Sequence, residues 1–277
     1  RDVIYDVRAV LKELVLDKNR FIEAMVYFKP KKYDKDNMKM IFRPLHTTSI
    51  IYQIASVAIL NMFVYEPNDG NDELTLSNIS RLIPENFYGN RVSTRPEVLF
   101  KPWKTQYKTY SQKANDLFKN YHETHEYNFE VDLDLKNFFP SVSIPMVYNQ
   151  VLHLLPVNLS EEEETVYKIL LIKLLTCKVV NLDENTCELY YENSWRENQT
   201  NFALGIAQGL PQSYFLGNIC MIEIAKIFEK NFPGKSLFYV DDSVIFCNDI
   251  KSDEDFQRRL DNINVEIKKL VSEENQN

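Results

Sequence analysis

Residues 238–246 read Phe-Tyr-Val-Asp-Asp-Ser-Val-Ile-Phe, an acidic pair between two runs of aromatic and β-branched residues. This pattern predicts two antiparallel strands joined by a turn at Asp241 and Asp242. Neighbouring carboxylates repel each other, and apolar flanks limit their hydration, so the pair carries an electrostatic cost. A divalent cation such as Mg²⁺, which prefers oxygen ligands, would offset that cost. The alternative is an ordinary polar turn, which is the commoner explanation of a lone Asp-Asp pair.

A second acidic strand and a Gln-Gly turn favour the metal-binding interpretation. Residues 128–135 alternate as a β-strand does, which places Asp132 and Asp134 on one face. Further along the chain, Gln208 and Gly209 form a turn before a long apolar helix. Each of these signals is weak alone, and their combination predicts a site built from distant segments.

Residues 86–120 combine basic and aromatic side chains. They contain seven Lys or Arg residues against two acidic ones. Cations neutralise phosphates and aromatic rings stack on bases, so this mixture suits a nucleic-acid surface, with Lys101 and Lys104 as candidate contacts. The alternative is an amphipathic segment whose aromatic rings belong to the core and whose lysines are solvated.

Composition and charge limit the class of protein. The chain has 277 residues, 44% of them hydrophobic, which excludes a disordered chain and allows one large or two smaller domains. The net charge of −8 conceals an asymmetry, because residues 1–120 carry +5 and residues 121–277 carry −13. The first part therefore suits an anionic partner, and the second holds carboxylates for another purpose.

No feature of the sequence indicates secretion or a membrane. The four cysteines form no C-x-x-C pair, which favours buried thiols in a reducing cytosol over a disulfide or metal framework. The longest apolar stretch, residues 49–65, is broken by polar residues and predicts a buried helix. The chain begins at Arg1 without a signal-like segment, so we expect a fragment of a cytoplasmic protein.

Local patterns predict further elements. Residues 2–28 carry apolar side chains at helical spacing and predict a helix. Ser160 and Glu163 predict a capping box at the start of another helix. Residues 181–200 are polar, include strand-forming tyrosines, and predict an exposed hairpin.

The acidic segments together resemble the motifs of reverse transcriptases. Asp134 with Phe138-Phe139 resembles motif A, residues 208–213 resemble motif B, and Tyr239-Val-Asp-Asp242 resembles motif C. The matches follow the family's order. Each motif is weak alone, but the ordered set is highly specific.

Two upstream segments extend the resemblance, which runs from about residue 40 to residue 250. Tyr88-Gly-Asn-Arg91 resembles the Y-G-x-R segment of the bacterial branch, and Arg43-Pro44 resembles its early arginine-containing strand. Ala207 and Tyr214 depart from bacterial relatives, which often have proline there. The divergent motif B and the Phe-rich motif A are most similar to bacterial abortive-infection and defence-associated antiphage reverse transcriptases.

The resemblance implies an α/β (α+β) fold of the right-hand polymerase type. Residues 1–127 would form the fingers and include the basic-aromatic segment 86–120. Residues 128–277 would form the palm, whose antiparallel sheet carries motifs A, B and C. The chain ends one helix after motif C, so no thumb is expected in it.

The resemblance also implies a metal site. Asp134, Asp241 and Asp242 would bind two Mg²⁺ ions, with Mn²⁺ as an alternative, for two-metal nucleotidyl transfer. Asp134 and Asp241 are the expected bridging ligands. The family's spacing from Asp to Phe-Phe selects Asp134 over Asp132, which is expected to be a neighbouring polar residue.

Further residues are implied to bind the incoming nucleotide. Phe139 would be the steric gate that excludes a 2′-hydroxyl, and Gln208 and Gly209 would contact the nucleotide or the template pair. Arg43 and Arg91 would bind phosphates. The plainer alternatives are a core aromatic for Phe139, an ordinary turn for Gln208 and Gly209, and surface ion pairs for the two arginines.

The implied activity is DNA synthesis from dNTPs, in the cytoplasm of a prokaryote and in defence against phage. The partners would be an RNA or DNA template and primer, or a self-primed DNA product, with Tyr239, Lys101 and Lys104 contacting nucleic acid. Templated synthesis, untemplated or protein-primed synthesis, and homo-oligomer formation stay open, and no membrane partner is expected. The alternatives are an RNA-dependent RNA polymerase, disfavoured by Phe139, and a non-catalytic nucleic-acid-binding scaffold.

Overall fold

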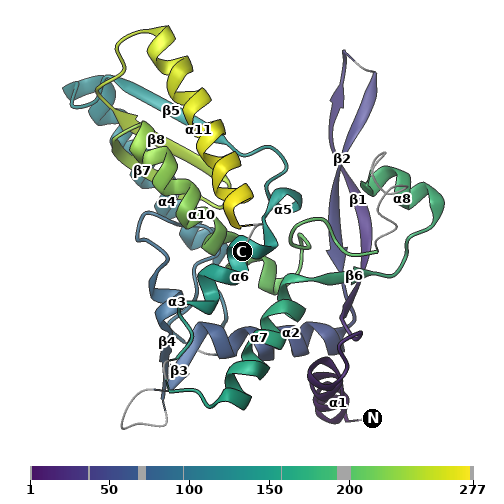
Figure 1. Ribbon diagram of the computed structural model, residues 1–277. Coiled ribbons are helices and arrows are strands. Elements are labelled where there is room, and N and C mark those ends of the chain that lie inside the picture. The colour runs from purple at the N-terminus through teal and green to yellow at the C-terminus, as the bar shows by residue number, and fades with distance from the viewer. Residues whose placement is uncertain are drawn as a thin grey trace. The chain divides into compact units, whose positions relative to one another are not determined.

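The computed structural model describes residues 2–36, 38–67, 73–95, 97–156, 158–191 and 201–274. Its mixture of helices and strands agrees with the predicted α/β class, and the chain forms two compact units (Figure 1). Unit 1 consists of Arg1–Met62, Phe139–Ile144 and Pro156–Tyr214, and unit 2 of Phe63–Phe138, Pro145–Leu155 and Phe215–Asn277. The division into fingers (1–127) and palm (128–277) stays a prediction.

A three-stranded sheet organises unit 1. Strand β1 (Ile22–Asp34) lies in its middle, antiparallel to β2 (Lys39–Thr47) and parallel to β6 (Cys177–Val179). The β1–β2 register shifts between Pro30 and Lys32, where a bulge or irregularity interrupts the ladder. The helices α1 (Val3–Leu16), α7 (Glu161–Leu175) and α8 (Glu184–Tyr191) belong to the same unit.

The helix predicted over residues 2–28 is wrong in its second half. α1 ends at Leu16, and the chain continues as β1 from Ile22. Buried Ile22, Ala24 and Val26 alternate with more exposed neighbours, which is the period of a strand. The helical spacing therefore holds only for the first part of the range.

The hairpin predicted over residues 181–200 is also wrong where the structure describes it. The tyrosines expected in strands, Tyr190 and Tyr191, lie in α8 with exposed fractions of only 5% and 3%. The Asp183 carboxylate accepts a hydrogen bond from a backbone N–H of the first turn of α8 at 2.7 Å. This cap stabilises the start of the helix, and the helix forms despite the preference of tyrosine for strands. Residues 192–200 lie outside the described part of the chain.

The capping box predicted for α7 is confirmed. Ser160 Oγ accepts a hydrogen bond from the Glu163 backbone N–H, and the Glu163 carboxylate accepts one from the Ser160 N–H at 2.9 Å. Four acidic residues then occupy the first turn, where they complement the positive end of the helix dipole. These acids need no catalytic explanation.

An antiparallel three-stranded sheet organises unit 2, in the order β5-β8-β7. Its strands are β5 (Phe129–Asp134), β7 (Gly234–Tyr239) and β8 (Asp242–Cys247). The two strands predicted around the acidic pair are confirmed, with the turn one residue earlier than expected, at Val240 and Asp241. Asp242 is the first residue of β8.

Helices cover both faces of this sheet. α4 (Trp103–Lys119) packs Tyr110 and Leu117 against a cluster that includes Val244 and Phe246 of β8. In Figure 1, α10 (Pro211–Asn231) and α11 (Asp253–Glu274) cross in front of the sheet and α4 lies behind it. The last five residues of β8 are accordingly all buried.

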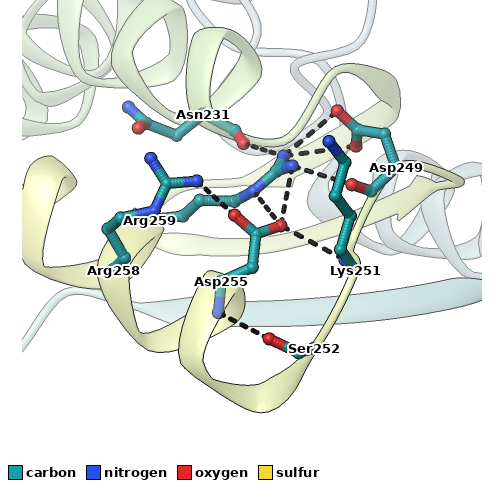
Figure 2. A network of polar contacts seen from close by, with 7 residues as sticks. All are labelled: Asn231, Asp249, Lys251, Ser252, Asp255, Arg258 and Arg259. Carbon is teal, nitrogen blue, oxygen red and sulfur yellow. Dashed lines mark hydrogen bonds and ion pairs between the residues drawn. The ribbon is translucent and has the colours of Figure 1, made fainter.

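A polar network attaches α11 to the end of α10 (Figure 2). Arg259, whose side chain is 13% exposed, donates hydrogen bonds to the carbonyl oxygens of Asn231 and Asp249, both at 2.8 Å. Its guanidinium also pairs with the Asp255 carboxylate at 3.0 Å. Hydrogen bonds from Arg259 and Arg258, and one from the backbone N–H of Lys251, lower the pKa of Asp255 to about 2. The start of α11 is thereby fixed to its neighbours.

The remaining named elements are short or contain residues of both units. The short ones are β3 (Tyr65–Pro67), β4 (Leu74–Leu76), α3 (Asn78–Arg81) and the π-helix η1 (Asn120–Thr124). Those with residues of both units, besides α10, are α2 (Ile50–Val64), α5 (Phe138–Ser141) and α6 (Ile144–Leu152). The apolar stretch at 49–65 thus forms the predicted helix, and no helix in the described part of the chain has the length and apolar character needed to cross a membrane.

Candidate functional site

Carboxylates from β5 and β8 share one face of the sheet in unit 2. Asp134 pairs directly with Asp242 in the strand register, and Asp132 lies two residues back on β5. Directly opposite residues point to the same side of a sheet and side chains alternate along a strand, so the three carboxylates share a face. All three line a pocket of about 310 Å³. The structure therefore brings together two of the three predicted ligands, and it adds Asp132.

Asp241 lies in the turn between β7 and β8 and is not among the residues that line this pocket. Within the described ranges, no group of three or more His, Cys, Asp or Glu residues is arranged to hold a metal ion. Val240, the residue before Asp241, has a φ of +61°, which is strained for a β-branched side chain. The convergence of Asp134, Asp241 and Asp242 on shared cations thus stays a prediction.

The Y-G-x-R segment at residues 88–91 supports the acidic hairpin. A Cβ atom on Gly89 would lie 2.6 Å from Val240 Cγ2 and 2.8 Å from Val240 N, so only glycine fits there without a shift. The Tyr88 backbone N–H donates a hydrogen bond to the Phe238 carbonyl at 2.8 Å. This segment therefore contacts the strand and the turn that carry the acidic pair.

Arg91, predicted to bind phosphate, contacts the backbone of its own segment. Its Nη1 donates hydrogen bonds to the carbonyl oxygens of Pro84 at 2.5 Å and Phe87 at 2.8 Å. Burial lowers the pKa of its guanidinium. The described contacts of Arg91 are thus structural, and its role in nucleotide binding stays a prediction.

Three tyrosines line the same pocket as the carboxylates. Tyr239 of β7 pairs with Asp242, and its ring centroid lies 5.3 Å from that of Tyr107 and 5.5 Å from that of Tyr110, both on α4. Burial, together with the charges of Asp242 and Asp132, raises the pKa of Tyr110 to about 12. The Tyr110 phenol therefore stays neutral and can donate a hydrogen bond.

The sequence interpretation did not identify Tyr107 and Tyr110 as pocket residues. The signal for them was their spacing of three within a helical segment, which places two rings on one helix face. What the spacing could not show was that this face lies against the strands of the acidic pair.

In unit 1, the predicted Gln208-Gly209 turn lies against β2. The backbone N–H of His46 donates a hydrogen bond to the Gln208 carbonyl at 2.7 Å, and His46 Nδ1 lies 3.2 Å from the same oxygen. Gly209 has a φ of +111°, and a Cβ atom there would lie 2.6 Å from the His46 carbonyl oxygen. Conformation and space both require glycine at this position.

Phe139, the predicted steric gate, lies in unit 1 and is 5% exposed. Its ring meets that of Tyr214 edge to face, with centroids 6.3 Å apart. The Phe139 carbonyl accepts a hydrogen bond from the Ile206 backbone N–H at 3.0 Å, just before the Gln-Gly turn. Burial is compatible with both a gate and a core aromatic, so the gate role stays a prediction.

Arg43, predicted to bind phosphate, lies on β2 directly opposite Lys29 of β1. Both residues are exposed, and because they are register partners their side chains share a face. Like charges placed opposite each other destabilise a sheet unless an anion lies nearby. Lys29, which lies on β1, was not predicted as a site residue.

The predicted nucleic-acid contacts lie at and near the start of α4. Lys104 extends over the ring of Trp103, with Nζ 5.8 Å from the ring centroid, and Trp103 is 64% exposed. The Lys101 backbone N–H donates a hydrogen bond to the Arg91 carbonyl at 2.8 Å. The basic-aromatic segment is thus mixed, with Tyr110 packed on the sheet and Trp103 presented to solvent.

Comparison with known proteins assigns a family. Residues 42–275 match the family model described as reverse transcriptase (RNA-dependent DNA polymerase). The matched range includes the segments that resemble motifs A, B and C, together with the upstream arginine-containing strand. No curated protein matches the chain.

Proposed function

The chain belongs to the reverse transcriptase (RNA-dependent DNA polymerase) family, and from this premise we propose that it synthesises DNA from dNTPs at Asp134, Asp241 and Asp242. Family membership identifies the protein as a nucleotidyltransferase with nucleotide substrates and a nucleic-acid template. We attribute the reaction to two Mg²⁺ ions, for which Mn²⁺ can substitute. The biological role that we propose is defence of a prokaryote against phage.

The opposition of Asp134 and Asp242 carries this proposal. Two carboxylates face each other across β5 and β8, and Asp132 adds a third on the same pocket wall. Such a set is electrostatically unfavourable without a counter-charge and consists of the hard oxygen donors that Mg²⁺ prefers. Asp241, next to Asp242 in the turn, is the remaining proposed ligand.

Two bound divalent cations would supply activation of the attacking hydroxyl and stabilisation of the leaving pyrophosphate. The chain's own residues hold the ligands in place, since Ser243 Oγ donates a hydrogen bond to the Leu133 carbonyl at 3.0 Å, beside the acidic pair. The rings of Tyr107, Tyr110 and Tyr239 form a wall of the pocket.

The nucleotide contacts that we propose lie in unit 1. Phe139 excludes the 2′-hydroxyl of the sugar, and Gln208 with Gly209 contacts the nucleotide or the template pair. Lys29 and Arg43 bind the triphosphate, because an anion would relieve the repulsion between two opposed cations.

Nucleic acid binds, in this proposal, through Lys101, Lys104 and Tyr239. Lysines contact phosphates without reading sequence, and exposed rings such as Trp103 can stack on bases. Arg91 contributes through the segment that supports the acidic hairpin.

The defence role rests on the similarity of motifs A and B to antiphage reverse transcriptases. It is tested in cells by comparing phage plating on strains that carry the wild-type protein or Asp134→Asn. Loss of protection in the variant is expected, and a scaffold that works without catalysis would still protect.

The activity is tested by incubating the protein with Mg²⁺ and labelled dNTPs, with and without an added template, and sequencing the product. Asp134→Asn or Asp242→Asn should lower incorporation at least about 100-fold. Glu130→Gln is a matched control, because Glu130 lies on β5 and does not line the pocket. Full activity in both Asp variants would disprove the proposed site, and product sequences would separate templated from untemplated synthesis.

The sugar preference separates DNA from RNA synthesis. In the same assay, Phe139→Ala should raise rNTP incorporation relative to dNTP incorporation. An unchanged ratio would remove the gate assignment, and a wild-type preference for rNTPs would favour the RNA polymerase alternative.

A further inference from the structure

A chain of hydrogen bonds connects α8 to the Gln208-Gly209 turn, wholly within unit 1. The Leu204 backbone N–H donates to Tyr190 Oη at 2.9 Å, and Tyr190 Oη lies 2.9 Å from His46 Nε2. His46 Nδ1 then lies 3.2 Å from the Gln208 carbonyl oxygen. The Leu204 backbone N–H, the Tyr190 hydroxyl and the His46 ring are thereby connected to the turn that is predicted to contact the nucleotide.

The direction of these hydrogen bonds follows from the donors available. The Gln208 carbonyl can only accept, so His46 Nδ1 must carry the proton that it donates. His46 Nε2 is then the acceptor of a neutral ring, and the Tyr190 hydroxyl donates to it. Burial lowers the pKa of His46 to about 4, which keeps the ring neutral at ordinary pH.

His46 fixes the Gln208 peptide at two points. Its backbone N–H and its ring Nδ1–H donate to the same carbonyl oxygen. The next residue, Gly209, approaches the His46 backbone so closely that a Cβ atom would lie 2.6 Å from the His46 carbonyl oxygen. The peptide plane between Gln208 and Gly209 is therefore held in one orientation, and the Gln208 Cα that carries the side chain is held with it.

From this geometry we propose that His46, held by Tyr190, is a positioning residue for Gln208 and thereby determines the affinity for the incoming nucleotide. The inference rests on the proposed role of Gln208 as a nucleotide contact. His46 contacts no reacting atom in this proposal and acts only through the turn.

Two adjacent tyrosines give a matched pair of variants. Tyr190 and Tyr191 are neighbours in α8, both buried, and each hydroxyl makes a hydrogen bond. The Tyr191 hydroxyl donates to the Phe202 carbonyl, at 2.6 Å, and not to His46. Tyr190→Phe and Tyr191→Phe therefore remove one buried hydroxyl each, but only the first interrupts the chain to Gln208.

The first measurement is steady-state dNTP incorporation with Mg²⁺. Tyr190→Phe should raise the KM for dNTP about 3- to 10-fold, the size of one lost hydrogen bond, with kcat changed less than about twofold. Tyr191→Phe should leave both parameters near wild type. His46→Asn, whose amide can still donate to the Gln208 carbonyl, should fall between wild type and His46→Ala. Equal KM values for the two tyrosine variants would overturn the proposal.

The second measurement does not depend on activity. Hydrogen exchange of the His46 backbone N–H reports its bond to Gln208 directly. Tyr190→Phe should accelerate this exchange about 3- to 10-fold, whereas Tyr191→Phe should not. If wild type incorporates no dNTP but this difference is seen, the proposed function fails and the positioning contact stands. Equal exchange in both variants would refute the contact even in an active enzyme.

Discussion

Asp134 and Asp242 lie opposite each other in the register of β5 and β8, and their carboxylates share a pocket with Asp132. Like charges that lie directly opposite each other in a sheet destabilise it. A counter-ion should therefore affect stability as well as catalysis.

Mg²⁺ should stabilise the wild-type protein against unfolding. At about a hundredfold excess over its Kd, a bound ion should raise Tm by about 5–10 °C. Asp242→Asn, which removes one of the opposed charges, should have a higher Tm than wild type in EDTA. Its Tm should increase little further with Mg²⁺. Thermal scans with and without the ion test both effects, and an undiminished Mg²⁺ shift in Asp242→Asn would contradict the assignment.

Gly89→Ala should displace the acidic hairpin, because the new Cβ atom would overlap Val240. We expect a loss of stability of about 1–3 kcal/mol and a fall in kcat larger than the change in KM. The control is Ile79→Val, a buried change with a cost of about 1 kcal/mol in α3, which is not part of the hairpin. Similar kcat values for the two variants, measured well below Tm, would show that the contact between Gly89 and Val240 does not affect the site.

His46 should make stability depend on pH. Its pKa is about 4 in the folded protein, because burial disfavours the charged ring, against 6.5 for the free side chain. Below about pH 6.5 the unfolded chain binds a proton that the folded protein does not, so the free energy of unfolding falls as pH falls towards 4. From about pH 7 to about pH 5 this group alone should cost about 2 kcal/mol. Denaturant titrations should show that the free energy of unfolding falls less with pH in His46→Asn than in wild type. Parallel curves of this free energy against pH for the two proteins would rule out a contribution from His46.

Lys29 and Arg43 should act together on the triphosphate. Lys29→Ala should raise the KM for dNTP about 5- to 20-fold, with a weaker salt dependence of KM, because one charge-assisted contact to phosphate is lost. Lys31→Ala is the control, since Lys31 is an exposed lysine at the irregular point of β1, where no register partner is assigned. Equal KM values for the two variants would leave the opposed cations without a role in nucleotide binding.

Arg259→Lys should loosen α11. A lysine cannot reproduce the planar set of hydrogen bonds to Asn231, Asp249 and Asp255. We expect a Tm lower by several degrees and faster hydrogen exchange in the first turns of α11. The Lys268→Ala variant, on the same helix and outside the network of Figure 2, should exchange like wild type.

The pattern of residues predicted the sheet of unit 2 well because the information was local. Alternation along β5 placed Asp132 and Asp134 on one face, and the Ser160 capping box gave the start of α7. The errors were local too. The helical period predicted for residues 2–28 does not continue past Leu16, and the two strand-forming tyrosines predicted a strand where Asp183 caps the helix α8.

The partners of the site residues were beyond prediction because they come from distant parts of the chain. His46 and Gln208 are 162 residues apart, and His46 alone gave no reason to link them. Likewise, Tyr110 approaches Asp242 only because α4 packs against β8. The order of the motifs indicated which residues belong to the candidate site. The residues that contact them became apparent only from the structure.

Both faces of β8 are covered by helices, and this limits where the chain can gain or lose residues. Inserting or deleting one residue within this strand would turn the following side chains, all of which are buried, to the opposite face and disrupt their packing on both sides. The β1–β2 hairpin already tolerates an irregular step between Pro30 and Lys32. Over evolutionary time, gains and losses of residues should therefore accumulate in that hairpin and be rejected in β8.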